Sequence, residues 1–262
     1  MSNFTITLIG ILFIFLMTTM GSTIVFFFKK KISDKANTIF LGFASGIMIA
    51  ASIWSLILPA LEMSKDYGNW KILPTLIGFL LGGVFLVLLD KVIPHIHSGI
   101  DKEEGPKNNF AKSTKLFLAV TIHNIPEGMA VGFAFGAAAV IGTSTAFLSA
   151  LGLAIGIGIQ NFPEGAAVAL PMEIATGSKK KAFLFGTMSG AIEPVFAVIG
   201  YFLASTIKFI QPWLLAFAAG AMMFVVAEDL IPDAKMESHP HWGTWGVMLG
   251  FVIMMILDVV FG

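Results

Sequence analysis

The chain has 262 residues, of which 56% are hydrophobic and 12% are charged, and its mean hydropathy is +0.88. Soluble domains carry about 25% charged residues, so this composition indicates an integral membrane protein despite the net charge of zero. The chain has no cysteine, which excludes disulfides and thiolate metal sites. No basic surface is interleaved with aromatic residues, so the sequence gives no support to nucleic-acid binding.

Eight apolar segments are long enough to cross a hydrocarbon core of roughly 30 Å, which takes about 20 helical residues. They cover approximately residues 5–28, 36–59, 72–92, 114–136, 144–170, 180–205, 212–231 and 242–262. We therefore predict an all-α integral membrane protein with eight transmembrane helices and one transmembrane domain over residues 1–262. Residues 93–113 are polar, and we expect them to form a flexible cytoplasmic loop with no core of its own.

The lysines predict the orientation. All sixteen basic residues are lysines, and thirteen of them lie at segment ends or in loops on one side. The other side has Lys65, Lys71 and Lys208. Cytoplasmic loops carry an excess of positive charge, so the lysine-rich side is expected to face the cytoplasm. Because the number of spans is even, both termini should then lie on the non-cytoplasmic side of the cell membrane.

The first and last thirds of the chain resemble each other. Residues of the third span recur in the eighth at an offset of 168, and residues of the second recur in the seventh at an offset of 174. The most informative match is Asp90 with Asp258, because a charged residue in an apolar segment rarely matches by chance. Helices 1–3 and 6–8 are thus predicted to form an inverted repeat around a central antiparallel pair, helices 4 and 5. Such repeats are typical of alternating-access carriers.

Two similar polar stretches interrupt the fourth and fifth spans. They read His-Asn-Ile-Pro-Glu-Gly over residues 123–128 and Gln-Asn-Phe-Pro-Glu-Gly over residues 160–165. The first and fifth positions of each stretch are four residues apart and share a helix face. Glu193, followed by Pro194, lies at a comparable depth in the sixth span. All the polar side chains of these three spans are therefore expected to meet near the bilayer midplane.

The chemistry of these side chains indicates a cation site. The predicted donors are one imidazole, three carboxamides and three carboxylates, from His123, Asn124, Glu127, Gln160, Asn161, Glu164 and Glu193. Mixed nitrogen and oxygen donors without thiolate suit borderline divalent ions such as zinc, iron(II), manganese, cobalt or nickel. Three buried carboxylates repel one another unless cations or protons neutralise them. A single buried His or Glu is more often a hydrogen-bonding residue between helices, but several at one depth favour a metal site.

Four acidic residues lie near the predicted span ends. Glu62 and Asp66 can gather cations at the outer mouth of a pathway. Asp90 and Asp258 can act as gating residues or as packing residues. The sequence leaves these alternatives open.

On the cytoplasmic side, His95 and His97 can capture metal, and a simply solvated loop is an equal alternative. Glu228 and Asp229 lie at the cytoplasmic end of the seventh span, where they can form an exit path or solvate the helix end. The same cluster includes Asp233, His239 and His241.

The two paired stretches together with Glu193-Pro194 resemble the ZIP (Zrt/Irt-like) family of divalent metal transporters, and look closest to its prokaryotic GufA-like and ZupT-like branches. The resemblance implies a binuclear site between helices 4, 5 and 6 and import toward the cytoplasm by an elevator-like or rocking motion. Its first position would take His123, Glu127, Gln160 and Glu164. Its second would take Asn124, Glu127, Asn161, Glu164 and Glu193. Some relatives carry Asp where this chain has Asn161.

The expected function is therefore transport of zinc, and also of iron(II), manganese, cobalt and cadmium, by a protein that is not an enzyme and holds no resident cofactor. The expected partners are divalent metal ions and the lipid bilayer, and the sequence leaves a homodimer open. Two alternatives compete with this interpretation. One is an intramembrane metal-dependent hydrolase, for which the sequence lacks a His-Glu-x-x-His pair. The other is a proton- or sodium-coupled carrier of an organic substrate.

Overall fold

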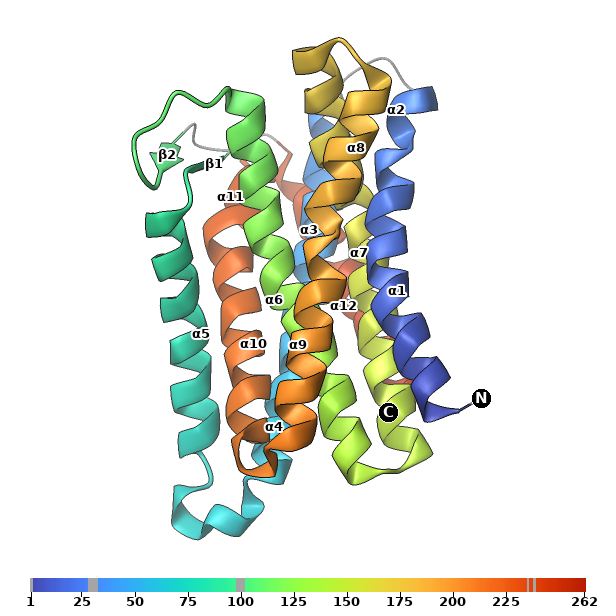
Figure 1. Cartoon of the computed structure of the whole chain (residues 1–262), viewed down its shortest axis with the longest axis vertical. Helices are drawn as coiled ribbons and strands as arrows, with labels where there is room; N and C mark the ends of the chain where they lie inside the picture. Colours follow the sequence, from blue (N-terminus) through green and yellow to red (C-terminus); the bar gives the residue numbers. More distant parts are fainter. Residues whose placement is uncertain (1, 28–32, 98–101, 235, 238) are drawn as a thin grey trace.

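The structure is a computed structural model, and it describes residues 2–27, 33–97, 102–234, 236–237 and 239–262. Within these residues, eight helical spans are long and apolar enough to cross a membrane. They run side by side in one bundle, and the two termini lie toward the same end of it (Figure 1). The prediction of an all-α membrane protein with eight spans is confirmed.

Several spans consist of consecutive helical segments. The first four spans comprise α1 (Asn3–Ser22) with α2 (Ile24–Phe27); α3 (Asp34–Ala51), η1 (Ser52–Ile57) and α4 (Leu58–Met63); α5 (Leu73–Val92); and α6 (Lys112–Ile141). The last four comprise α7 (Ser144–Thr176); α8 (Lys179–Gly190) with α9 (Ile192–Thr206); η3 (Lys208–Ile210), α10 (Gln211–Val225), η4 (Val226–Leu230) and α11 (Ile231–Asp233); and α12 (Pro240–Phe261). A short 3-10 helix, η2 (Lys65–Trp70), connects α4 to α5.

Local sequence signals set the ends of the two central helices. The Thr143 hydroxyl accepts a hydrogen bond from the Ala146 backbone N–H and caps the start of α7. Gly142 and Gly177 end α6 and α7 in left-handed backbone conformations, with φ of 77° and 64°. Glycine adopts this conformation without a Cβ clash, so these two residues are natural helix ends. Both helices therefore run past the apolar segments that predicted them.

The inverted repeat is visible in the helix packing. A methyl group added at Gly78 on α5 would lie 2.6 Å from the Trp213 carbonyl oxygen on α10. A methyl group added at Gly246 on α12 would lie 2.6 Å from the Ile39 carbonyl oxygen on α3. These four residues are related by the repeat offsets of 168 and 174. Equivalent residues thus make equivalent close contacts, as a repeat of structure requires.

The two π-helical segments follow the same repeat. η1 begins at Ser52 and η4 begins at Val226, again 174 residues apart. π-Helical turns alter the direction of the side chains that follow them and occur often at functional sites. α4, which follows η1, and α11, which follows η4, lie toward opposite ends of the bundle (Figure 1).

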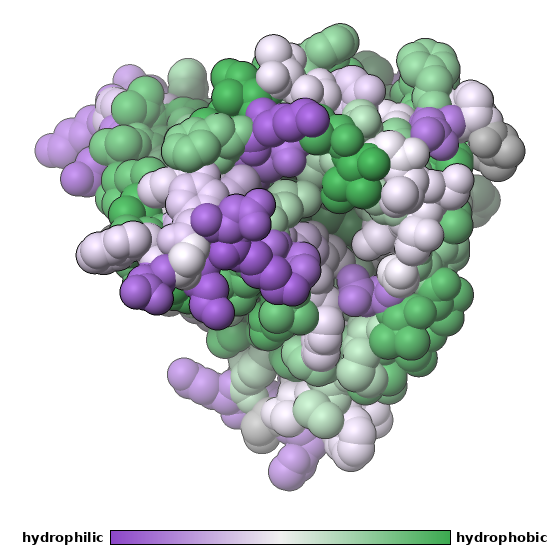
Figure 2. Space-filling view, turned by 90° about the horizontal axis from the view of Figure 1, so that it is seen from below, coloured by the Kyte–Doolittle hydropathy of each residue, from purple (hydrophilic) through white to green (hydrophobic). Residues whose placement is uncertain are grey.

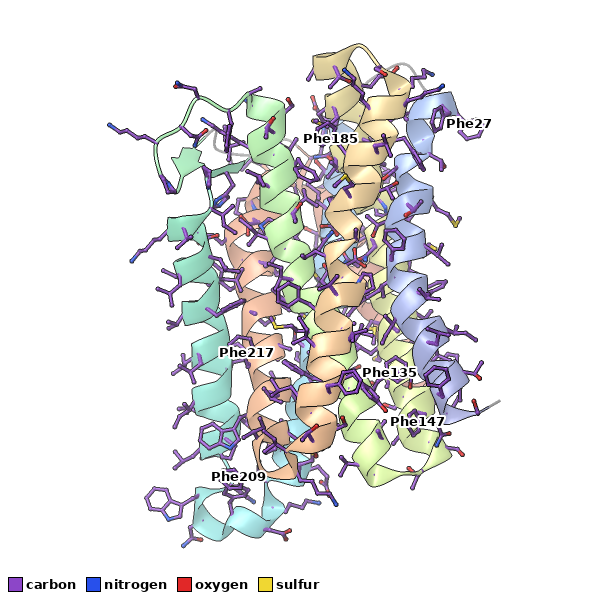
Figure 3. All side chains as sticks on the ribbon, in the orientation of Figure 1. Phe27, Phe135, Phe147, Phe185, Phe209 and Phe217 are labelled. Carbon is purple, nitrogen blue, oxygen red and sulfur yellow. The ribbon has the colours of Figure 1, made fainter. Side chains whose placement is uncertain are left out.

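The core lies between α6, α7 and the helices around them. Phe135 on α6 is fully buried, and Phe147 on α7 is nearly so (Figure 3). Large apolar side chains on the outer surface, such as Leu80 and Val259, are exposed and suited to contact with lipid. Seen from the end at the bottom of Figure 1, hydrophilic side chains gather on part of the surface and hydrophobic ones form much of the outline (Figure 2).

Part of the loop over residues 93–113 has regular structure. Strand β1 (His95–His97) pairs antiparallel with β2 (Lys102–Glu104), with His95 opposite Glu104. The side chains of His95 and Ile96 are buried, and β1 packs against α6. The hairpin therefore covers one end of α6, and flexibility of the rest of this loop stays a prediction.

Candidate metal site

The two polar stretches meet at the contact between α6 and α7. The Gln160 Nε2 donates a hydrogen bond of 2.6 Å to the Glu127 Oε1. Glu127 and Gln160 are each 1% exposed. The predicted meeting of the fourth and fifth spans is therefore a direct contact between polar side chains deep in the bundle.

Glu193 joins these residues from the first turn of α9 and is fully buried. The Asn161 Nδ2 donates to the Glu193 Oε2 at 2.8 Å, and the Gln160 Nε2 also approaches the Asn161 Oδ1 at 2.6 Å. A continuous hydrogen-bonded chain thus runs from Glu127 through Gln160 and Asn161 to Glu193. It connects three helices, as the sequence predicted.

Asn124 is held from its other side. Its Nδ2 donates to the Ser189 carbonyl oxygen at 2.8 Å, near the junction of α8 and α9. This bond fixes the side-chain amide, so the Asn124 Oδ1 has a defined direction. Among the described residues the Oδ1 has no hydrogen-bond partner, although it is buried.

Three side-chain oxygens of this cluster are buried without a hydrogen bond from any described residue: Asn124 Oδ1, Glu127 Oε2 and Gln160 Oε1. An unsatisfied buried acceptor costs roughly 1–3 kcal/mol, so such atoms are rare in folded proteins. All three are oxygens that can accept a cation. None of the three glutamates of the site pairs with a lysine in the part of the chain that the structure describes.

A cavity of about 550 Å³ leads to this cluster. Its inner wall includes His123, Gln160 and Glu164, and its outer part includes Asp34, which is exposed at the start of α3. The Glu164 carboxylate faces this space and makes no hydrogen bond or ion pair to the described residues. The cavity therefore reaches one layer of the cluster, while Asn124, Asn161 and Glu193 are buried behind it.

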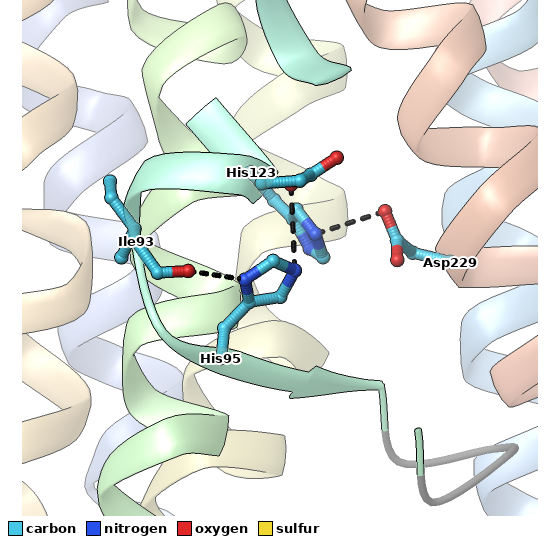
Figure 4. A network of polar contacts seen from close by, with 5 residues as sticks. Ile93, His95, His123 and Asp229 are labelled. Carbon is cyan, nitrogen blue, oxygen red and sulfur yellow. Dashed lines mark hydrogen bonds and ion pairs between the residues drawn. The ribbon is translucent and has the colours of Figure 1, made fainter. Parts of the chain in front are cut away.

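His123 has a partner on the opposite wall. Its Nε2 lies 3.0 Å from the Asp229 Oδ2, which belongs to the π-helical segment η4 (Figure 4). Nearby, the His95 Nδ1 lies 2.8 Å from the Ile93 carbonyl oxygen, and the His95 Nε2 lies 3.4 Å from the Asp90 Oδ1. The structure thus places Asp90, His95 and Asp229 at the same end of the bundle as His123.

The remaining peripheral residues lie away from the cluster. Glu62 forms an exposed ion pair with Lys65, and Asp66 lies in η2 at that end of the molecule. Asp258 accepts a hydrogen bond of 3.0 Å from the Ser55 hydroxyl. Glu228 is exposed although its neighbour Asp229 is buried. The side chain of His97 lies outside the described residues.

The cluster is not already arranged around an ion. Among the described residues no three His, Asp or Glu side chains are close enough together to hold a metal. The Gln160 amide explains part of this, because its Nε2 occupies the space between Glu127 and Asn161. Rotation of this amide would turn its unpaired oxygen toward an incoming cation and withdraw the N–H group.

Sequence reasoning missed Thr18. Its Oγ1 donates a hydrogen bond of 2.9 Å from α1 to the Glu193 Oε1, and the residue is fully buried. Thr18 precedes Glu193 by 175 residues, close to the repeat offsets of 168 and 174. The offset of 174 would pair Glu193 with the adjacent Thr19, so the sequence repeat points to this turn of α1 but not to Thr18 itself.

Known proteins resemble the whole chain. The family profile described as "ZIP Zinc transporter" matches residues 4–116 and 111–258. Human "Zinc transporter ZIP11" is 36% identical over 97% of this chain and 97% of its own length. "Zinc transporter GufA" of Myxococcus xanthus is 37% identical over 89% of this chain and 90% of its own, and "Zinc transporter ZupT" of Clostridium perfringens is 34% identical over 94% and 92%. The chain is therefore a multi-pass membrane protein that belongs to the ZIP family of transporters, and not an enzyme.

Proposed function

We propose that this chain transports divalent transition-metal cations toward the cytoplasm, with zinc as its main substrate and iron(II), manganese, cobalt and cadmium as others. The observation that carries the proposal is the set of buried oxygens without hydrogen bonds beside a cavity whose lining includes His123, Glu164 and Asp229. The names of the relatives, all zinc transporters, support zinc as the first substrate. The mixed oxygen and nitrogen donors are compatible with the other ions.

The site would hold two ions that share Glu127 and Glu164. The first ion would bind to His123, Glu127, Gln160 and Glu164, and three of these side chains line the cavity. The second would bind to Asn124, Glu127, Asn161, Glu164 and Glu193, deeper in the bundle. The burial of these side chains supports this order, because an ion that arrives from the cavity meets the first group before the second.

Neutralisation of the buried carboxylates favours cation binding. The carboxylates of Glu127, Glu164 and Glu193 lie inside the bundle, and no lysine within the described residues pairs with them. Two divalent cations carry enough charge to offset all three carboxylates. Displacement of Gln160 Nε2 from Glu127 would accompany binding, because that N–H group and a cation compete for the same oxygen.

The cavity and the lysines together support an inward-open conformation, which is compatible with the proposed import. The large cavity is walled by Asp34 at the start of α3 and Asp233 at the end of α11, which lie at the lysine-rich end of the bundle. At the other end a smaller space of about 160 Å³ is lined mainly by alanines and by Leu153 and Leu215. If the lysine-rich end faces the cytoplasm, the described conformation is open inward, and both termini lie outside the cell membrane.

Transport by purified protein tests the proposal. In proteoliposomes, Glu127→Ala and Glu164→Ala should each abolish zinc uptake, because each removes a carboxylate that both ions share. Glu173→Ala is the matched control, since Glu173 lies on α7 close to the helix end and away from the cluster. This variant should take up zinc at the rate of the unmodified protein.

Folding has to be measured beside uptake. Both site variants should elute as single species from size-exclusion chromatography and reach the same membrane level as the control. Normal uptake of zinc, iron(II), manganese and cadmium by both site variants would refute the assignment of the site. Competition among these metals with the unmodified protein would rank the substrates, and reversal of the gradient across oriented liposomes would test the direction.

A further inference from the structure

We propose that Thr18 is a positioning residue that holds Glu193 in the geometry needed for the second ion. This inference rests on the proposed function, because it assigns the hydroxyl a task at a metal site. Thr18 lies on α1, which carries none of the predicted ligands. Its contribution would therefore be indirect, through the carboxylate of α9.

The contact is direct and fully buried. The Thr18 Oγ1 lies 2.9 Å from the Glu193 Oε1 and 3.3 Å from the Ile14 carbonyl oxygen, and both Thr18 and Glu193 are 0% exposed. A hydroxyl has a single proton, so these two acceptors compete for it. The Glu193 oxygen is the nearer of the two acceptors, and its hydrogen bond is the stronger one whenever the carboxylate is ionised, as it would be with a bound cation, so Glu193 is the favoured acceptor.

This bond completes the hydrogen bonding of Glu193. The Asn161 Nδ2 donates to the Oε2 at 2.8 Å, and the Thr18 hydroxyl donates to the Oε1. Each carboxylate oxygen therefore accepts one hydrogen bond and keeps a lone pair for a cation. Donors from two different helices, α1 and α7, hold the carboxylate at both ends and fix its plane.

Packing keeps the Thr18 side chain in place. A methyl group added at Gly190, at the end of α8, would lie 2.7 Å from the Thr18 Cβ and 3.0 Å from its Oγ1. The backbone of α1 is also close to α7, because a methyl group at Gly165 would clash with the Thr18 carbonyl oxygen. The hydroxyl thus comes from a rigid part of the bundle, as accurate positioning of a ligand requires.

The inverted repeat gives this contact a place in the architecture. A methyl group at Gly128 would clash with the Glu193 carbonyl oxygen, just as one at Gly165 would clash with that of Thr18. Gly128 and Gly165 are the equivalent last residues of the two polar stretches. Thr18 and Glu193 consequently occupy equivalent positions, and where one repeat supplies the carboxylate, the other supplies the donor that orients it.

Removal of the Thr18 hydroxyl should lower the affinity for the second ion and leave the affinity for the first unchanged. In Thr18→Val the shape is nearly kept, but the Glu193 Oε1 loses its donor in a buried position. The carboxylate is then free to turn toward Asn161, away from the direction that an ion needs. We expect one of the two zinc affinities to fall about tenfold, the effect of losing one hydrogen bond to a charged group.

Isothermal titration of purified protein with zinc measures this. The unmodified protein should bind two zinc ions, Thr18→Val should retain one affinity and lose about tenfold in the other, and Thr18→Ser should restore both. Thr19→Val is the matched control, because its buried hydroxyl has no hydrogen-bond partner among the described residues. That variant should bind zinc like the unmodified protein.

A second comparison separates positioning from packing. In a Glu193→Ala background, Thr18→Val should cause no further loss of zinc affinity, because the acceptor that the hydroxyl orients is absent. Equal losses in Thr18→Val and Thr19→Val, or no rescue by Thr18→Ser, would overturn the inference. Two unchanged affinities in Thr18→Val would overturn it while leaving the proposed function intact. An unmodified protein that binds no zinc would overturn both.

Discussion

The two polar stretches on α6 and α7 have nearly the same sequence, yet the structure uses them differently. On α6, Glu127 is buried and accepts a hydrogen bond from Gln160. On α7, the equivalent Glu164 faces the cavity without such a bond. His123 pairs with Asp229 across the cavity, whereas its counterpart Gln160 points its amide into the cluster. The stretches are equivalent in sequence and unlike in environment.

This difference shows that the backbone packing follows the inverted repeat more closely than the polar side chains do. The backbones follow it closely, because Gly128 and Gly165 make matching contacts with α9 and α1. The polar side chains depart from it. Among the described residues, the large cavity lies at one end of the bundle, and the space at the other end is smaller. A carrier that alternates between two openings needs such a departure, since each conformation exposes the site to one side.

The largest effect should come from a change that disturbs the shared packing. Gly128→Ala and Gly165→Ala should each strongly destabilise the protein and reduce transport, because the added methyl would clash with the Glu193 or Thr18 backbone. Overpacking of this kind costs about 1–3 kcal/mol. Thermal unfolding followed by size-exclusion chromatography measures the loss, and the two variants should lose similar amounts.

Gly83→Ala is the control for this comparison. The nearest atom to its added methyl would be the Phe224 Cδ2 at 3.7 Å, an ordinary contact. Alanine is favoured over glycine in helices by about 1 kcal/mol, so this variant should be as stable as the unmodified protein or more so. A large difference between Gly128→Ala and Gly165→Ala would show that the packing does not share the symmetry.

The sequence predicted most of the fold because the length of each apolar segment is a strong signal. It placed the end of the fifth span near residue 170, whereas α7 ends at Thr176. The reason is that Pro171 and Glu173 interrupt the apolar run, whereas the helix continues until Gly177 ends it in a left-handed conformation. The hairpin of β1 and β2 was not predicted, because the burial of His95 and Ile96 against α6 is a tertiary contact without a local pattern.

For the site, the spacing of polar residues along single helices predicted which residues lie together. It could not predict their hydrogen-bond partners on helices distant in the sequence. Thr18 is an ordinary residue in an apolar helix until Glu193 is placed beside it. Glu228 and Asp229 are adjacent acidic residues that the sequence treats alike. The π-helical turn of η4 directs Asp229 toward His123 and leaves Glu228 exposed. Such a turn has no reliable sequence signature.

A second prediction tests the pair of residues by which the two stretches differ most. His123→Gln makes the first stretch resemble the second and removes the imidazole of the proposed first position. Zinc uptake should fall at least about tenfold. A loss of this size is usual even when the mutated residue only hydrogen-bonds to a metal ligand and does not bind the metal itself. The preference for zinc over manganese should also decrease, because imidazole nitrogen favours zinc and oxygen donors suit manganese.

The reverse change, Gln160→His, should act in the opposite sense on selectivity. It removes the amide that now bonds to Glu127 and adds a second imidazole to the first position. Competitive uptake of zinc and manganese in proteoliposomes measures both variants. Identical selectivity in His123→Gln, Gln160→His and the unmodified protein would mean that neither position contacts the transported ion.

The smallest effect should come from Asn161→Asp, which changes one atom at the contact between α7 and α9. The Asn161 Nδ2 now donates to the Glu193 Oε2 at 2.8 Å. Replacement by a carboxylate would bring two acceptors together where a donor met an acceptor, and this repulsion should destabilise the metal-free protein. A loss of about 1 kcal/mol corresponds to a melting temperature about 2–4 °C lower for a chain of this approximate size.

Zinc between the two carboxylates would remove the repulsion, so the stabilisation by zinc should be larger in Asn161→Asp than in the unmodified protein. Thermal unfolding with and without zinc gives both quantities. An equal or smaller zinc effect in the variant would place the second ion away from Asn161, and the asymmetry between the stretches would then lie outside the metal site.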